Sequence, residues 1–150
     1  MKHSIQLLII TYVLGGLASC ALTPQDLSKN ERIHRLLNIR VLTSESLRLY
    51  ELAPSKRNSP DITHSIDSIT VGNDPSERFI GIVPSGSAVK FDHAFAQRGS
   101  GGTWAWLEGM LSHQGSIYRV QYYMGFPDME NPNGWGRVYR YFRFPKPQER

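Results

Sequence analysis

The carboxyl-terminal region holds the densest mixture of arginine and aromatic residues in the chain. Residues 136–144 contain three arginines, four aromatic residues and one valine. If this segment is a strand, alternation places one set of side chains on a single face: Arg137, Tyr139, Tyr141 and Arg143. Such a face could stack on a sugar ring or hold an anionic group, because a guanidinium forms paired hydrogen bonds to phosphate and carboxylate. The alternative, which we favour, is an ordinary strand whose solvated arginine stems cover the tyrosine rings.

A second group with chemical potential surrounds two tryptophans. Strand parity places Trp104, Trp106 and Glu108 on the same face, and we include both tryptophans in the candidate binding face. Glu108 is the best single candidate for a general acid, as in a small hydrolase that acts on envelope glycan. A solvated strand carboxylate is the simpler interpretation, so no catalytic residue is assigned.

The histidines and serines do not form a recognisable catalytic or metal site. No two histidines have the His-x-x-x-His or His-Glu-x-x-His spacing, and the sequence predicts neither a metal nor another cofactor. His93 follows Asp92, but neighbours on a regular strand point to opposite faces, which argues against a catalytic pair. No serine lies in a Gly-x-Ser-x-Gly motif, and residues 97–102 predict a hairpin loop.

Short strands separated by turn signals must position these side chains. Alternation within residues 88–95 predicts that four side chains share one face: Val89, Phe91, His93 and Phe95. Further strands are predicted over residues 103–111, 117–124 and 138–144. Residues 53–65 and 127–134 are rich in proline and polar residues and predict long surface loops.

The amino-terminal part of the domain predicts a different element. Thr23 can cap a helix, Pro24 suits its first position, and apolar residues continue to Leu37 before a stop at Asn38. We expect this helix to pack on the domain, and a partly ordered tether is the alternative. Of the 16 aromatic residues, 14 lie between residues 79 and 144, so the core is expected there.

Composition excludes several classes of protein. With 150 residues, 40% hydrophobic and 20% charged, the chain predicts one folded domain and not a disordered segment. The net charge of +4 is too small for a dense basic stripe, so we expect no nucleic-acid partner. One cysteine excludes an intrachain disulfide and an all-cysteine zinc site.

The first twenty residues predict an export signal. Lys2 precedes an apolar run over residues 5–14, which is shorter than the ~20 residues of a membrane span. The run ends in Leu17, Ala18, Ser19 and Cys20, which together resemble the lipobox of bacterial lipoproteins. The resemblance implies cleavage before Cys20 and attachment of fatty acyl chains to its sulfur and its new amine. The alternatives are an ordinary signal peptide with a chance cysteine, or a cytosolic protein with a buried first helix.

The lipobox resemblance also implies a location and a division of the chain. Ala21 stands where aspartate tends to retain lipoproteins in the inner membrane, so the resemblance implies the outer membrane, facing the periplasm. We therefore expect a signal peptide over residues 1–19, an anchor, tether and short helix over residues 20–37, and a β domain over residues 38–150.

Parts of the β domain resemble bacterial SH3-like domains. Residues 79–89 are similar to the strand, glycine-containing turn and strand at the centre of such domains, and residues 104–109 resemble the next strand. Residues 47–50 correspond to a first strand, and Gly134 and Trp135 to the Gly-Trp pair before the last one. The resemblance implies a mainly β fold, a small antiparallel SH3-like barrel or sandwich preceded by a short helix. The sequence departs from it by the insertion of residues 53–65 and by a late Gly-Trp pair.

These features together favour a lipid-anchored binding or scaffolding protein of the cell envelope, without enzymatic activity. The expected partners are the membrane, through Cys20, and either an envelope protein or the peptidoglycan. Small lipoproteins of this size often resemble immunity or inhibitor proteins, which form one subtype of this interpretation. A small envelope glycan hydrolase and a structural subunit of an envelope complex stay open as alternatives.

Overall fold

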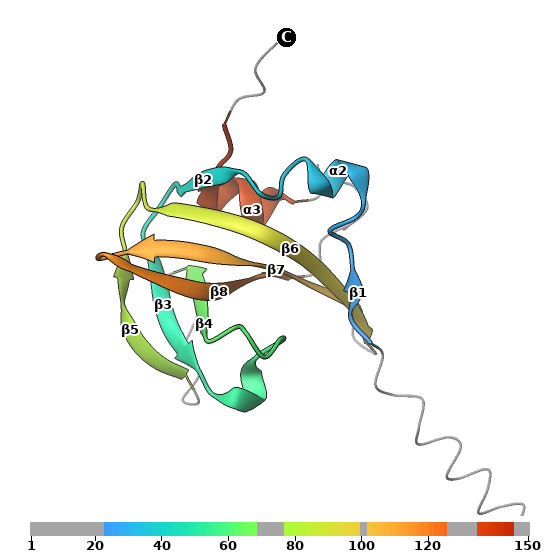
Figure 1. Ribbon diagram of the computed structural model, residues 1–150, viewed down its shortest axis with the longest axis horizontal. Coiled ribbons are helices and arrows are strands. Elements are labelled where there is room, and N and C mark those ends of the chain that lie inside the picture. The colour runs from blue at the N-terminus through green and yellow to red at the C-terminus, as the bar shows by residue number, and fades with distance from the viewer. Residues whose placement is uncertain (1–22, 69–76, 100–101, 126–134, 146–150) are drawn as a thin grey trace, which may run out of the picture.

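The described part of the chain is built mainly from β-strands. A computed structural model describes residues 23–68, 77–99, 102–125 and 135–145, so Cys20 and the predicted loop over residues 127–134 lie outside it. Most of the described residues are in strands, which confirms the predicted mainly β fold. Figure 1 shows a single sheet that curls part of the way towards a barrel, with short helices beside it.

The described elements are nine strands, two short helices and one 3-10 turn. The strands are β1 (Gln25–Asp26), β2 (Arg40–Thr43), β3 (Leu47–Leu52), β4 (His64–Ser68), β5 (Glu77–Val83), β6 (Ala88–Gly99), β7 (Gly102–His113), β8 (Ser116–Gly125) and β9 (Phe142–Arg143). The helical elements are α2 (Glu31–His34), the 3-10 turn η1 (Pro54–Lys56) and α3 (Gly136–Tyr141).

One sheet contains all nine strands found in the described residues. Its order is β5-β3-β4-β8-β7-β6-β2-β9, and β1 pairs with β6 beside this path. Every pairing is antiparallel except that of β4 with β8, in which His64 lies opposite Val120. The sheet is therefore mixed, where the sequence predicts an antiparallel one.

The long strands β6, β7 and β8 form the centre of the sheet. β7 and β8 are joined by a two-residue turn in which Gln114 and Gly115 have φ of 50° and 78°. Positive φ at both central residues matches the right-handed twist of the strands that such a turn connects. The three strands cross the middle of Figure 1, with β2, α2 and α3 to one side.

A bulge in β6 reverses which side chains face the core in the second half of the strand. Phe91 pairs with Gly109 and His93 with Glu108, so Asp92 is one extra residue on its strand. Before the bulge Phe91 is buried in the core, and after it Ala94 and Ala96 are buried instead. The predicted shared face of Val89, Phe91, His93 and Phe95 is therefore wrong beyond Phe91, because a single inserted residue reverses the alternation.

The amino-terminal segment is extended before its short helix. The predicted helix from Thr23 is wrong at its start, because β1 occupies residues 25–26 and only Glu31–His34 form a helical turn. The Leu27 backbone N–H donates to the Ala94 carbonyl at 2.8 Å, which holds the segment to β6. Ile33 is fully buried, so this part of the chain packs on the sheet and is not a tether.

The predicted carboxyl-terminal strand is also different in the structure. Residues 136–141 form α3, and only Phe142 and Arg143 continue as β9. Trp135, Val138 and Tyr141 are buried at a spacing of three residues, which is the period of one helix face. Phe142 packs edge-on against Phe91, with ring centroids 5.0 Å apart.

The main core lies between one face of the sheet and the segments around α2 and α3. It includes Leu107 and Leu111 of β7, Tyr122 of β8 and Trp135 before α3. Alternation sends another set of side chains to the opposite face of β6, β7 and β8, which we call the outer face: Phe95, Gln97, Trp104, Trp106, Glu108, Gln121 and Tyr123.

Gly109 is required by the close approach of β6 and β7 at the bulge. A Cβ at this position would lie 2.3 Å from the Lys90 carbonyl oxygen and 2.7 Å from the Phe91 Cα. We expect Gly109→Ala to lower the free energy of unfolding by about 2–3 kcal/mol, because backbone atoms must move to admit the methyl group. Urea denaturation measures this difference.

Gly81→Ala is the matched control, because Gly81 also lies in a strand and a Cβ there would meet nothing within 4 Å. Equal stability of the two alanine variants would contradict the role assigned to the close approach at Gly109.

Candidate binding site

An open cavity lies on the outer face, beside the two tryptophans that the sequence singles out. Its volume is about 410 Å³, which falls in the usual range of small-ligand sites. Its lining comes from five strands and from the loop between β3 and β4: Lys56, Asn58, Ser65, Ile66, Asp67, Glu77, Gln97, Trp104, Trp106, Gln121 and Tyr123. We call it the Trp104 cavity.

Three aromatic rings form the apolar part of this cavity. Trp104 and Trp106 lie two residues apart on β7 and so share a face, as predicted, while Tyr123 lies opposite Trp106 on β8. The Trp104 side chain is 45% exposed, and its ring centroid lies 6.0 Å from that of Tyr123, with the planes tilted by 55°. Trp106 is buried and stacks on Phe95, with centroids 5.5 Å apart.

Side-chain amides and a loop complete the cavity. Gln97 lies opposite Trp104 on β6. Gln121 Oε1 accepts a hydrogen bond from the Asn58 backbone N–H at 3.3 Å, and its Nε2 donates to the Lys56 carbonyl at 3.4 Å. Gln121 therefore fastens the loop to the sheet while its side chain contributes to the cavity.

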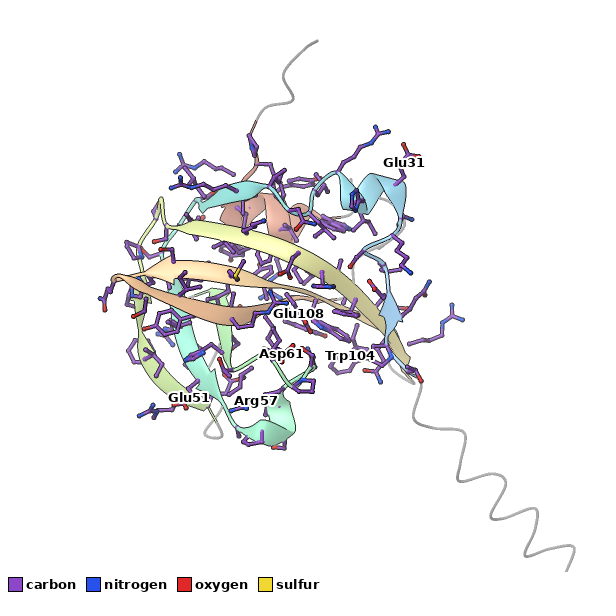
Figure 2. The ribbon with its side chains drawn as sticks, viewed as in Figure 1. Glu31, Glu51, Arg57, Asp61, Trp104 and Glu108 are labelled. Atoms are coloured by element: carbon purple, nitrogen blue, oxygen red, sulfur yellow. The ribbon has the colours of Figure 1, made fainter. Side chains whose placement is uncertain are left out.

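Glu108 supports the floor of the cavity, which is Trp106, and the loop between β3 and β4. The Trp106 indole N–H donates to Glu108 Oε1 at 3.0 Å, and the Ser59 hydroxyl donates to Oε2 at 3.0 Å. Glu108 is only 3% exposed, so the expected solvated carboxylate is wrong. Figure 2 shows Glu108 and Trp104 beside the loop that carries Asp61. Both carboxylate oxygens accept bonds that hold other residues in place, which is the geometry of a positioning residue.

The loop between β3 and β4 is built to dock on the sheet. Pro54 begins η1, and the Arg57 guanidinium donates to the Leu52 carbonyl at 3.4 Å. Ile62 is fully buried, so an apolar side chain anchors the far end of the loop. The sequence predicts a surface loop here, and its attachment through Ser59 depends on a distant strand that no local pattern reveals.

The predicted face of Arg137, Tyr139, Tyr141 and Arg143 does not exist as a surface, because α3 replaces the strand. Tyr141 is buried in the core, whereas Tyr139 is exposed and packs against Phe144, with centroids 5.4 Å apart. Arg143 is exposed on β9. Only Arg137 reaches the Trp104 cavity, through an ion pair of 3.5 Å with Asp67.

Arg137 also acts on the aromatic wall of the cavity. Burial raises the pKa of the Tyr123 hydroxyl, and the positive charge of Arg137 opposes that rise. Of the six residues of the predicted binding face, Trp104 and Trp106 line the cavity and Arg137 contacts its lining. The missed residues Gln97 and Gln121 have a local signal, because each shares a strand face with an aromatic residue. Gln121 lies beside Tyr123 of the cavity, and Gln97 lies beside Phe95, which stacks on Trp106.

A second hollow, lined by polar and charged residues, lies at the bulge in β6. Its volume is about 540 Å³ and its lining includes His34, Asp92 and His93. His93 Nδ1 lies 2.9 Å from Asp92 Oδ1, so the expectation that these neighbours point apart is wrong, because the bulge turns them together. The described residues contain no group of three or more side chains able to hold a metal ion.

Asp92 is held as a carboxylate by its neighbours. Burial alone would raise the pKa of Asp92, but hydrogen bonds from Arg119 and His93 outweigh burial and hold the pKa below its ordinary value. A carboxyl group of this kind stabilises the fold at pH above its unfolded pKa, and the contribution is lost as the pH falls through the folded pKa.

We expect Asp92→Asn to be less stable than the wild type at about pH 6, by about 1 kcal/mol, because the ion pair with Arg119 is partly exposed. The difference should shrink towards zero as the pH falls through the lowered pKa of Asp92, because the wild-type carboxylate is then protonated too. Urea denaturation at a series of pH values measures it. Asp61→Asn, in an exposed loop position, is the matched control. A difference for Asp92→Asn that stays constant over this range would rule out the assigned cause.

Comparisons with known proteins supply no relative: no family model, no curated protein and no solved structure matches the chain. None of the helices in the described ranges combines the length and the apolar character required to cross a bilayer.

Proposed function

We propose that this protein is a lipid-anchored, non-enzymatic binding module of the bacterial cell envelope, and that the Trp104 cavity binds peptidoglycan. The observation that carries the proposal is the open cavity itself, which places an exposed tryptophan beside amide side chains on β6 and β8. Large apolar side chains exposed at the mouth of a cavity commonly mark a binding site.

The arrangement around Glu108 supports binding and not hydrolysis. A general acid must present a proton to the bond that breaks, whereas both oxygens of Glu108 accept bonds from Trp106 and Ser59 and the side chain is nearly closed to solvent. An envelope protein, including the target of an immunity or inhibitor lipoprotein, is the alternative occupant of the cavity.

The anchor is part of the proposal and rests on the lipobox resemblance of residues 17–20. Two or three acyl chains on Cys20 would hold the protein at a membrane, since each buried methylene contributes about 0.8 kcal/mol. The first strand begins at Gln25, so the sheet would lie close to the bilayer surface.

Mass spectrometry of the protein purified from native membranes should find a chain that begins at Cys20 and carries fatty acyl groups. Cys20→Ser should abolish both the cleavage and the added mass, because the sulfur is the site of acylation. An intact Met1, or a processed chain whose cysteine still reacts with maleimide, would disprove the anchor.

Binding to peptidoglycan can be tested with purified cell-wall sacculi. We expect the detergent-solubilised protein to sediment with sacculi and Trp104→Ala to bind at least tenfold more weakly, which corresponds to a loss of about 1.4 kcal/mol or more. The readout is the fraction of protein in the pellet over a range of sacculus concentrations.

Ile117→Ala is the matched control, because Ile117 is a large apolar residue on β8 that is 74% exposed and does not line the cavity. Equal losses in the two variants would assign the binding to general surface hydrophobicity. Recovery of a discrete envelope protein, with no sedimentation on sacculi, would favour the alternative occupant.

A further inference from the structure

The chemistry of the Trp104 cavity also identifies which part of a wall polymer it fits. We propose that the cavity is a subsite for an uncharged sugar ring of the glycan backbone, and not for the charged stem peptide. This inference rests on the proposed function, because it names the ligand chemistry of the same site.

The aromatic wall is suited to the apolar face of a pyranose ring. Trp104 is 45% exposed although its neighbour Trp106 is buried, so one indole face is presented to a ligand while the other tryptophan forms the floor. The tilt of 55° between Trp104 and Tyr123, with centroids 6.0 Å apart, forms two walls of a cleft and not a flat patch. Flat, amphipathic rings of this type give large contact area at small cost in side-chain entropy.

The polar groups of the cavity suit hydroxyl and acetamido groups. An amide side chain carries both a donor and an acceptor, as a sugar hydroxyl does, and the lining contains Asn58, Gln97 and Gln121. Gln121 makes one hydrogen bond through Oε1 and one through Nε2, so each atom retains capacity for a second partner. The cavity therefore places side-chain amides, which can donate or accept hydrogen bonds, next to an aromatic wall.

The charges of the cavity do not favour a charged ligand. Lys56 is opposed by Asp67 and Glu77 in the same lining, and Asp67 is itself paired with Arg137 at 3.5 Å. A site for a peptide with several carboxylates would present several positively charged side chains, usually arginines that point into the cavity. The observed mixture instead suits a neutral ligand that is bound by stacking and by amide hydrogen bonds.

The walls are held in place before any ligand arrives. Glu108 fixes the floor through Trp106 and the loop through Ser59, and Gln121 fixes the loop a second time through Asn58. Prior organisation of this kind reduces the entropy that a weakly binding sugar would otherwise have to offset.

The test titrates the full chain, solubilised in detergent, with three soluble probes. Chitotriose supplies uncharged N-acetylglucosamine rings like those of the wall backbone, maltotriose supplies uncharged rings from another kind of glycan, and a free stem peptide supplies the charged alternative. Calorimetry measures the affinity, and the change in tryptophan fluorescence reports whether an indole is contacted.

We expect chitotriose to bind and the affinity for the stem peptide to be at least tenfold lower. The comparison of the affinities for chitotriose and maltotriose distinguishes the wall backbone from other glycans. Trp104→Ala and Gln97→Ala should each weaken chitotriose binding at least tenfold, while Ile117→Ala leaves it unchanged. Trp104→Phe should retain part of the affinity, because a ring still forms the wall.

The outcomes separate this inference from the proposed function. Sedimentation with sacculi together with binding of the stem peptide alone would overturn the sugar subsite and leave the peptidoglycan module standing. Failure to bind both sacculi and all three probes would overturn both. Chitotriose binding that Trp104→Ala does not weaken would place a sugar site elsewhere and overturn the assignment to this cavity.

Discussion

The carboxylate of Glu108 is almost completely shielded from water, and a buried charge is stable only where donors replace the lost hydration. Two donors do so, and they come from different parts of the chain: the indole of Trp106 on the same strand and the hydroxyl of Ser59 in the loop after β3. Because Glu108 accepts both hydrogen bonds, the floor of the cavity and the loop that forms one of its walls are fixed relative to each other. Removal of either donor would leave part of the charge unsatisfied, so the arrangement is maintained as a unit.

The bulge at Asp92 is caused by a single residue, but it changes the direction of the side chains that follow it on β6. One extra residue on β6 reverses the alternation, so Ala94 and Ala96 enter the core while His93 and Phe95 turn to the outer face. Phe95 can then stack on Trp106, which adds a second support to the floor. The absence of a side chain at Gly109 permits the two strands to approach closely where the extra residue is accommodated.

The sequence predicts those features that depend on local alternation and turn chemistry. It predicts a mainly β chain, the three long central strands, and the shared face of Trp104, Trp106 and Glu108, all of which the structure bears out. The prediction fails for residues 136–144. Their composition favours a strand, whereas the buried residues Val138 and Tyr141 are three positions apart, as on one face of a helix. It also fails where the contact is between distant segments, as for the docked loop and the parallel pairing of β4 with β8, because no local pattern encodes them.

The parallel pairing has a consequence for how the molecule assembles. Two residues separate β6 from β7 and two separate β7 from β8, so these strands pair through contacts that are local in the sequence. The pairing of β4 with β8 instead joins His64 to Val120, which are far apart in the sequence, so it closes a much longer loop. The loop that walls the cavity lies between β3 and β4, so its final position depends on this long-range pairing. The binding surface is therefore complete only when both the local pairing of β6, β7 and β8 and the distant pairing of β4 with β8 have formed.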